Sequence, residues 1–271
     1  MRSLVRVIKS LRLSYCEHKS SRGAAVLLIH GNSSSKDVFA KQVPPLCAGG
    51  YSFVIPDLPG HGSSARSETP RSTYSFPGYA AVLHALMGEL GHRSYHVVGW
   101  SLGGHIGIEM MARYGAVKSL LVSGTPPVSL DPDGIAAGFN WTPSTALAGK
   151  RVFSREDAIR YVRAMMGARL APAQQIETAL RTDGDARHWM VRNGMRGVGA
   201  DEVRTITEDD RPFAVVQGAS DPFVRTDYLA RLPYKNVWTG APVFVEAGHA
   251  AHWQAPGVFN SNMMEFLRAA N

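Results

Sequence analysis

Short apolar runs rich in β-branched residues alternate along this chain with longer stretches in which apolar residues recur at a helical period. The short runs predict β-strands and the longer stretches predict amphipathic helices. Their alternation is typical of an α/β fold, here with a mostly parallel eight-stranded sheet flanked by helices. The last six runs are apolar enough for strands buried on both faces. The predicted strands span residues 4–8, 11–16, 25–29, 52–55, 96–98, 117–122, 213–216 and 243–245.

One helical stretch precedes the fifth predicted strand. Its apolar residues Leu83, Leu86, Met87 and Leu90 are spaced i, i+3, i+4 and i+7, which places them on one face of a helix. Gly91 follows directly, and glycine is common just after the last helical turn. The pattern predicts a helix that covers the sheet and ends near residue 91.

The alternation stops at residues 124–127, and no strand-like run returns until Phe213. Within this interval Ser154, followed by Asp157 three residues later, predicts the start of a helix. We expect a helical cap over residues 126–205, inserted into an α/β core of residues 1–125 and 206–271. Such a cap would cover the crevice at the carboxyl ends of the strands, where α/β sheets bind ligands. The apolar stripe of the predicted cap helix comprises Ala158, Tyr161, Val162, Met165 and Met166.

Composition and charge narrow the functions open to this fold. With 271 residues, of which 45% are hydrophobic, the chain can bury a large core and is too apolar to be disordered. Its net charge of +7 would suit nucleic acid if the basic residues clustered. They are instead spread along the chain with acidic residues between them, which is typical of a solvated surface. We therefore expect no nucleic-acid partner; the small-molecule substrate that we expect instead follows from the resemblance described below.

The sequence also bears on where the protein works. Its apolar runs are far shorter than the ~18 residues of a membrane-spanning helix. Basic residues between positions 2 and 12 interrupt the N-terminal apolar stretch, which argues against a secretory signal. The two cysteines, Cys16 and Cys47, are too few for a disulfide framework. We expect a cytoplasmic protein with no membrane partner, and the pattern leaves its oligomeric state open.

The strongest chemical signal is the segment Gly99-Trp100-Ser101-Leu102-Gly103. It matches G-x-S-x-G and lies between a predicted strand and a predicted helix, the context in which this motif exposes a nucleophilic serine. The unpaired N–H groups of the helix N-terminus would also favour the negative charge that develops on an attacked carbonyl oxygen. Ser101 is therefore the predicted nucleophile. We also expect Trp100, directly before it, to contact substrate.

A serine nucleophile needs a base, and the order Ser, Asp/Glu, His predicts one near the C-terminus. His249 follows the last predicted strand after the flexible Gly248 and is the predicted base. His252 reads more simply as a packing or surface residue. An H-x-x-H metal site is a weaker reading still, because no third ligand has suitable spacing.

The third member of the triad is an acid at a strand's carboxyl end, and Asp221 has this position after the strand over 213–216. Asp209 and Asp210 precede that strand and would emerge at its opposite end. Glu246 is expected on the last strand or the surface. The turn after the sixth strand offers no carboxylate. Asp221 is therefore the predicted acid.

Two backbone N–H groups would form the oxyanion hole. One is that of Leu102, after the nucleophile, and the other belongs to the loop after the third strand. There Asn32 would donate its backbone N–H, and its side chain could also contact substrate. His30 and His61 lie in neighbouring loops and are expected to be structural.

Four segments together resemble the α/β-hydrolase fold family: LLIHGNSSS (27–35), DLPGHG (57–62), GWSLGGHIGIEM (99–110) and GHAAHWQAP (248–256). Further segments narrow the resemblance to the metal-independent N-acyl-homoserine lactonases, which quench bacterial quorum signals. These are GTPPV (124–128), ALAG (146–149), RTDGDAR (181–187) and DPFV (221–224). The cap motifs ALAG and RTDG carry most weight, because generic hydrolases do not share their caps.

The resemblance implies Ser101 as nucleophile, His249 as base, and the N–H groups of Asn32 and Leu102 as the oxyanion hole. It also implies that Tyr161, in the predicted cap, hydrogen-bonds substrate. The reaction would open the lactone ring of an N-acyl-homoserine lactone without a metal or other cofactor. Apolar cap residues would enclose the acyl chain, with Phe139, Trp141, Met165, Met166, Trp189 and Met190 as candidates.

The chain departs from the lactonase pattern at Asp221, where that pattern has a glutamate, and from many hydrolases at Gln254, where a glutamate is common. The same triad would also serve a broad carboxylesterase, a different lactonase or an amide-cleaving acylase. A ligand receptor with an unused triad is an alternative of another class, and the complete predicted triad argues against it.

Overall fold

The computed structural model describes residues 2–20 and 25–271, and in them eight strands form one sheet in the order β1-β2-β4-β3-β5-β6-β7-β8. β1 and β2 form an antiparallel hairpin, and β2 is antiparallel to β4; all later pairs are parallel. The predicted fold class and all eight predicted strands are confirmed. The bounds are β1 Leu4–Ile8, β2 Leu11–His18, β3 Ala25–Ile29, β4 Ser52–Pro56, β5 Tyr95–Trp100, β6 Val117–Ser123, β7 Phe213–Gly218 and β8 Val243–Val245.

One detail of the strand prediction is wrong. β8 was expected to be buried on both faces, but Phe244 at its centre is 40% exposed. β8 is at the edge of the sheet and, among the described strands, pairs with β7 alone. The apolar run therefore predicts a strand correctly but does not show how deeply it is buried.

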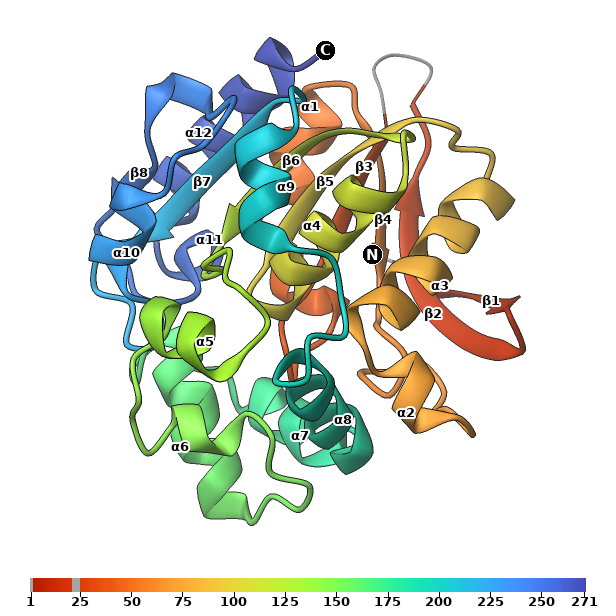
Figure 1. The fold of residues 1–271 in the computed structure, drawn as a ribbon. Coiled ribbons are helices and arrows are strands. Elements are labelled where there is room, and N and C mark those ends of the chain that lie inside the picture. The colour runs from red at the N-terminus through yellow and green to blue at the C-terminus, as the bar shows by residue number, and fades with distance from the viewer. Residues whose placement is uncertain (1, 21–24) are drawn as a thin grey trace.

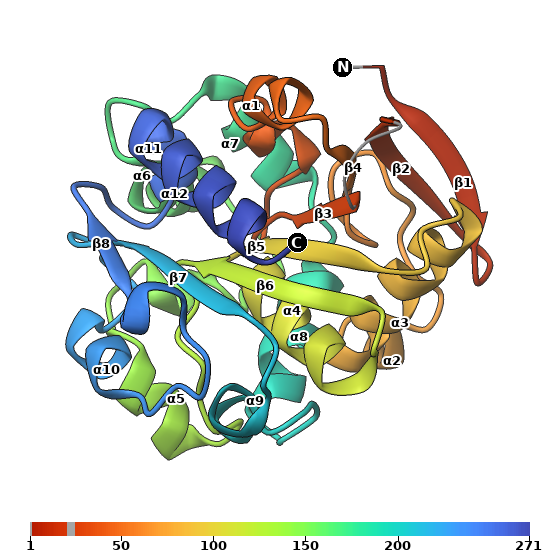
Figure 2. The ribbon, with the colours of Figure 1, turned by 90° about the horizontal axis from the view of Figure 1, so that it is seen from above.

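Helices cover both faces of the sheet (Figure 2). On one face lie α1 (Val43–Ala48) and α12 (Pro256–Ala269), and on the other lie α3 (Phe76–Glu89), α4 (Leu102–Arg113) and α9 (Glu202–Glu208). Leu83, Leu86 and Met87 of the predicted stripe lie on α3, Leu90 is the residue directly after its end, and Gly91 follows with a φ of 87°. This arrangement buries the central strands on both sides. The remaining short elements outside the β6–β7 interval are η1 (Lys36–Phe39), α2 (Pro70–Thr73), α10 (Thr226–Arg231), η3 (Trp238–Gly240) and α11 (Ala251–Gln254).

Between β6 and β7 the chain forms a group of helices at the carboxyl ends of the parallel strands (Figure 1). They are α5 (Pro132–Gly138), η2 (Thr145–Leu147), α6 (Arg155–Met166), α7 (Ala173–Arg181) and α8 (Gly184–Gly194). α6 begins as expected: the Ser154 hydroxyl accepts from the Asp157 N–H, and the Asp157 carboxylate accepts from the Ser154 N–H. All five residues of its predicted stripe are buried.

Arg187 on α8 joins these helices to the loop after β3. Its buried guanidinium lies over the Phe153 ring, 4.0 Å from the ring centre, and donates to the Ser33 hydroxyl at 3.4 Å. Burial lowers the pKa of Arg187 to about 10. No carboxylate pairs with this cation among the described residues, and backbone carbonyls of Lys150, Arg151, Ala179 and Thr182 accept its remaining hydrogen bonds. The helical insertion is thus organised around one buried arginine.

No helix in the described part of the chain has both the length and the hydropathy to cross a membrane.

Candidate active site

Ser101 occupies a strained turn between β5 and α4. Its φ of 54° and ψ of −120° lie in a region that side chains rarely adopt, and the neighbouring glycines make the turn possible. A Cβ on Gly99 would lie 2.4 Å from the Gly103 carbonyl oxygen, and one on Gly103 would lie 2.0 Å from that of Ile29. The sequence G-x-S-x-G therefore produces the sharp strand-to-helix turn predicted for it.

The loop after β3 lies directly against Ser101. A Cβ on Gly31 would lie 3.1 Å from the Ser101 Cβ. The backbone N–H groups of Asn32 and Leu102 have no acceptor among the described residues. The structure therefore brings two unpaired donors close to the serine, which is the arrangement an oxyanion hole requires.

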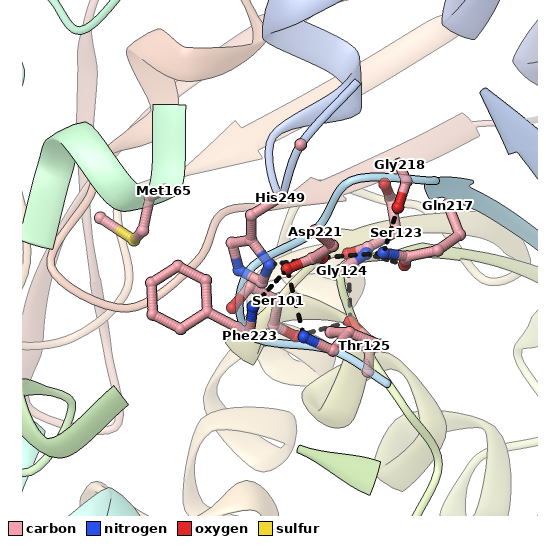
Figure 3. A network of polar contacts seen from close by, with 12 residues as sticks. Ser101, Ser123, Gly124, Thr125, Met165, Gln217, Gly218, Asp221, Phe223 and His249 are labelled. Carbon is pink, nitrogen blue, oxygen red and sulfur yellow. Dashed lines mark hydrogen bonds and ion pairs between the residues drawn. The ribbon is translucent and has the colours of Figure 1, made fainter. Parts of the chain in front are cut away.

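His249 and Asp221 form a buried pair. The His249 Nδ1 lies 2.8 Å from the Asp221 Oδ2 (Figure 3). The same carboxylate accepts from the Phe223 N–H at 2.8 Å, from the Val224 N–H at 3.2 Å and from the Gln217 Nε2 at 2.8 Å. With four donors around two oxygens, Asp221 is held as an acceptor, so the Nδ1 of His249 carries the proton and its Nε2 is free to accept one.

Sequence reasoning missed Gln217 and Thr125, whose side chains belong to the hydrogen-bond network around Asp221 and Ser101 (Figure 3). The Gln217 amide donates to Asp221 and accepts from the Gly124 N–H at 2.9 Å, so it links the ends of β7 and β6. The Thr125 hydroxyl donates to the Ser101 carbonyl at 2.8 Å. Their position at the ends of predicted strands was the available signal, but nothing in the sequence showed which way they point.

Two contacts fix the His249 loop. Gly124, with a φ of 64°, lies so close to the imidazole that a Cβ there would be 2.8 Å from the His249 Cε1. The Trp100 indole N–H donates to the His249 carbonyl at 3.0 Å. Trp100 is 1% exposed and is not among the residues that line the cavity described below. The expected contact between Trp100 and substrate is therefore replaced by a positioning contact behind the base.

Gln254, where hydrolases commonly have a glutamate, also holds this loop. Its Oε1 accepts from the Gly248 N–H at 2.8 Å, and its Nε2 donates to the Met165 carbonyl of α6 at 3.4 Å. The amide therefore joins the histidine loop to the helical insertion, a link that a carboxylate would lack because it cannot donate.

Ser101 and His249 both line a cavity of about 260 Å³ beneath the helical insertion, referred to below as the active-site cavity. Its wall is mostly apolar, and none of its described lining residues is a lysine or arginine. Of the six apolar residues expected to enclose a ligand, Phe139, Trp141 and Met190 line it. Met165, Met166 and Trp189 do not; the two methionines are buried within the insertion instead.

Asn32 and Tyr161 also line the active-site cavity, and they contact each other. The Asn32 amide donates to the Ala148 carbonyl at 2.9 Å and to the Tyr161 hydroxyl at 3.3 Å. Both amide hydrogens are thereby used, whereas the Tyr161 hydroxyl proton has no acceptor among the described residues. Burial raises the pKa of Tyr161 to about 12, so this proton stays available for a ligand.

The other histidines near the site are enclosed. His30 receives the Leu58 N–H on its Nε2 at 3.0 Å, and His61 lies 5.4 Å from it, ring centre to ring centre. His252 is fully buried against Phe39 and Trp100, without a partner for either ring nitrogen among the described residues. These positions agree with packing roles. No group of three His, Cys, Asp or Glu side chains within residues 2–20 and 25–271 is arranged to hold a metal ion.

This burial predicts a loss of stability in acid. Burial lowers the pKa of His252 to about 3, against about 6.5 in an unfolded chain. Below pH 6.5 only the unfolded state takes up this proton, so the free energy of unfolding falls as the pH drops toward 3. At pH 5 the cost is about 2 kcal/mol. Urea titrations at pH 7.5 and pH 5 measure how far the free energy of unfolding falls between these two pH values. We expect this fall to be about 2 kcal/mol smaller in His252→Leu than in the unchanged protein. An identical loss in both proteins would contradict this account.

The fold and the serine turn define the class of the protein. Residues 26–261 match the model of the alpha/beta hydrolase family, and the chain belongs to this family. It is a hydrolase of that fold.

More particular similarities agree with the resemblance noted in the sequence. The structure matches a variant of the N-acyl homoserine lactonase AidH, complexed with N-hexanoyl homoserine lactone, at 36% identity and a TM-score of 0.95. The match covers 100% of this chain and 99% of that one. A second AidH structure, complexed with N-butanoyl homoserine, matches at the same identity and TM-score over 100% of this chain and 98% of that one.

Other relatives are more distant. A 2-hydroxy-6-oxononadienedioate/2-hydroxy-6-oxononatrienedioate hydrolase of Cupriavidus pinatubonensis is 26% identical over 93% of this chain and 90% of its own. A putative aryl esterase from Burkholderia cenocepacia shares the fold, with 21% identity and a TM-score of 0.80 over 99% of each chain.

Proposed function

We propose that this protein is a serine hydrolase that opens the lactone ring of N-acyl-homoserine lactones to give N-acyl-homoserines. The observation that carries the proposal is the AidH match, which spans the whole chain, helical insertion included. We further propose that residues 126–205 act as a cap on a core of residues 1–125 and 206–271. In support, the active-site cavity is lined from both parts.

In the proposed reaction His249 takes the proton of the Ser101 hydroxyl as its Oγ attacks the lactone carbonyl. The N–H groups of Asn32 and Leu102 stabilise the resulting oxyanion. His249 then protonates the leaving ring oxygen, which opens the ring and leaves an acyl-enzyme. A water molecule deprotonated by the same imidazole releases the product and restores Ser101. Asp221 keeps the imidazole in the required tautomer throughout.

The cavity suits a neutral, partly apolar substrate. An acyl-homoserine lactone carries no charge, and the cavity wall offers no cation and few polar groups. The substrate in the name of the Cupriavidus relative is a dicarboxylate. In this cavity its two carboxylates would have no lysine or arginine to pair with among the described lining residues. We propose that Tyr161 donates its hydroxyl proton to a substrate carbonyl. Unpaired Cys16 and Cys47 support a reducing, cytoplasmic setting as part of the same proposal.

Mass analysis of the product tests this function. Incubation with N-hexanoyl homoserine lactone is expected to give one product, heavier than the substrate by one water. Free hexanoic acid with intact homoserine lactone would instead show an amide-cleaving acylase. The matched comparison is p-nitrophenyl butyrate: a higher kcat/KM for this ester, with no ring opening, would contradict the proposal and identify a general carboxylesterase.

A further inference from the structure

A second buried histidine–carboxylate pair lies at the active-site cavity, apart from the proposed triad. The His105 Nδ1 on α4 lies 2.8 Å from one oxygen of Glu202 on α9 and 3.0 Å from the other. Glu202 is 1% exposed and also accepts from the Val128 N–H at 3.0 Å. A carboxylate buried this deeply is retained only with partners that satisfy it, and the mechanism proposed above uses neither residue.

The His105 ring is held in one orientation. It stacks on Phe76, with the ring centres 5.3 Å apart and the planes 6° from parallel, and Phe139 lies 5.9 Å away on a tilted plane. Its Nδ1 is fixed by Glu202, and its Nε2 has no hydrogen-bond partner among the described residues. His105 lines the active-site cavity, and this Nε2 is not among the enclosed unpaired atoms. The Nε2 is therefore a polar atom that a ligand can reach.

Two other polar side chains of that wall, Thr145 and Asn32, are already engaged. The Thr145 hydroxyl donates to the Asn140 carbonyl at 2.7 Å, and both amide hydrogens of Asn32 are used within the protein. Ser101, His249 and Tyr161 are assigned to the reacting end. Within the part of the chain that the structure describes, His105 is thus the remaining titratable side chain in the cavity wall that is open to a ligand.

The partner of Nδ1 sets the chemistry of Nε2. Because Glu202 accepts from both the Val128 N–H and the imidazole, the proton of the neutral ring resides on Nδ1. The Nε2 then presents a lone pair, which accepts from a hydroxyl and repels a carbonyl oxygen. The site therefore discriminates between a ligand that donates a hydrogen bond and one that only accepts.

We propose that His105 selects acyl chains that carry a hydroxyl at the third carbon, by accepting that hydroxyl's proton on Nε2. His105 lies on α4, four residues after Ser101 at the start of the helix, so at 1.5 Å per residue its backbone is about 6 Å farther along the helix axis. In an acyl-homoserine lactone one trans amide, spanning about 3.8 Å, and two further bonds separate the lactone carbonyl from the third acyl carbon, about 6 Å in all. The inference rests on the proposed lactonase function for this choice of substrate.

The test compares kcat/KM for N-(3-hydroxyoctanoyl), N-(3-oxooctanoyl) and N-octanoyl homoserine lactones. We expect the 3-hydroxy compound to exceed the unsubstituted one about tenfold, and His105→Phe to reduce this ratio about tenfold, the factor that corresponds to one lost hydrogen bond. Phenylalanine preserves the stacking on Phe76 and removes both nitrogens. His84→Phe is the matched control, because His84 is likewise stacked on an aromatic ring and hydrogen-bonded through Nδ1, but outside the cavity.

Glu202→Gln is a more discriminating test than His105→Phe, because it is expected to reverse the substrate preference rather than remove it. With its oxygen on the Val128 N–H, the new amide would donate to His105 Nδ1 and shift the ring proton to Nε2. The preference is then expected to reverse, from the 3-hydroxy to the 3-oxo substrate, an outcome that a merely structural role would not produce. This variant also decides the question if His105→Phe does not fold.

The possible failures are distinguishable. If the protein opens no lactone, the proposed function is wrong, and the same ratios are measured on methyl esters of N-(3-hydroxyoctanoyl)glycine and N-octanoylglycine, which keep the carbonyl-to-hydroxyl spacing. A ratio near one in the unchanged protein overturns the inference on either substrate series. So does a ratio that both substitutions leave unaltered.

Discussion

Ser101→Ala is expected to reduce kcat/KM for N-hexanoyl homoserine lactone by about 10⁶-fold, down to the rate supported by binding and the oxyanion hole alone. The substitution removes the Oγ that is proposed to form the acyl-enzyme. The base His249 remains in place, but it cannot replace the missing nucleophile. The strained turn persists, because the glycines at 99 and 103 and the hydrogen bond from Thr125 remain. Single-turnover and steady-state assays of ring opening measure the effect.

Ser123→Ala is the matched control for this prediction. Ser123 ends the neighbouring strand, is buried, and its hydroxyl has no hydrogen-bond partner among the described residues. Its removal is expected to leave turnover within about twofold. Ring opening by Ser101→Ala at more than a hundredth of the original rate would show that another group attacks the lactone.

Local sequence patterns predicted the strands, the helix α6 and the serine turn. The strands and α6 could be located because each follows from neighbouring residues: apolar runs for strands, and Ser154 with Asp157 for the start of α6. The serine turn was predictable for the same reason, since Gly99 and Gly103 lie within two residues of Ser101. Strand order at the carboxyl edge then brought Asp221 and His249 together, as the positions after their strands indicated.

The parts that were missed depend on contacts between distant residues. Glu202 lies 97 positions from His105, and Gln217 lies 93 positions from Gly124. Periodicity does not encode such pairings, because they form only when α9 packs on α4 or β7 pairs with β6. The expectation for Trp100 overlooked a local rule instead: at a strand end successive side chains point to opposite sides, and the next residue, Ser101, is the one that lines the cavity.

Two histidine–carboxylate pairs at one cavity divide the proposed work. His249, paired with Asp221, lines the cavity with Ser101 and is proposed to transfer protons. His105, paired with Glu202, lies farther along α4 and is proposed to recognise the hydroxyl of the acyl chain. In both pairs a buried carboxylate fixes the tautomer of its imidazole. The difference lies in the surroundings of the two imidazoles: His249 lines the cavity together with Ser101, whereas His105 is stacked on Phe76 in the apolar wall.

Asp221→Asn is expected to lower kcat for lactone opening by about 10⁴-fold while leaving substrate binding nearly unchanged. The carboxylate accepts four hydrogen bonds, two on each oxygen, whereas an asparagine side chain offers one oxygen. If the new amide nitrogen faces His249, it donates to Nδ1 and forces the ring proton onto Nε2. That nitrogen can then no longer accept the Ser101 proton. Steady-state kinetics that separate kcat from KM measure the loss.

Asp227→Asn and Asp221→Glu complete this test. Asp227 lies on the exposed helix α10, pairs with Arg225 and Arg231, and should tolerate the same substitution with no more than a twofold change in kcat. Asp221→Glu restores a carboxylate of the kind that the resembling lactonases carry at this position, so it is expected to retain far more activity than Asp221→Asn. A loss of less than tenfold in Asp221→Asn would mean that Gln217 and the loop contacts orient His249 without the acid. In that case the carboxylate would matter for folding this edge of the sheet rather than for holding the tautomer.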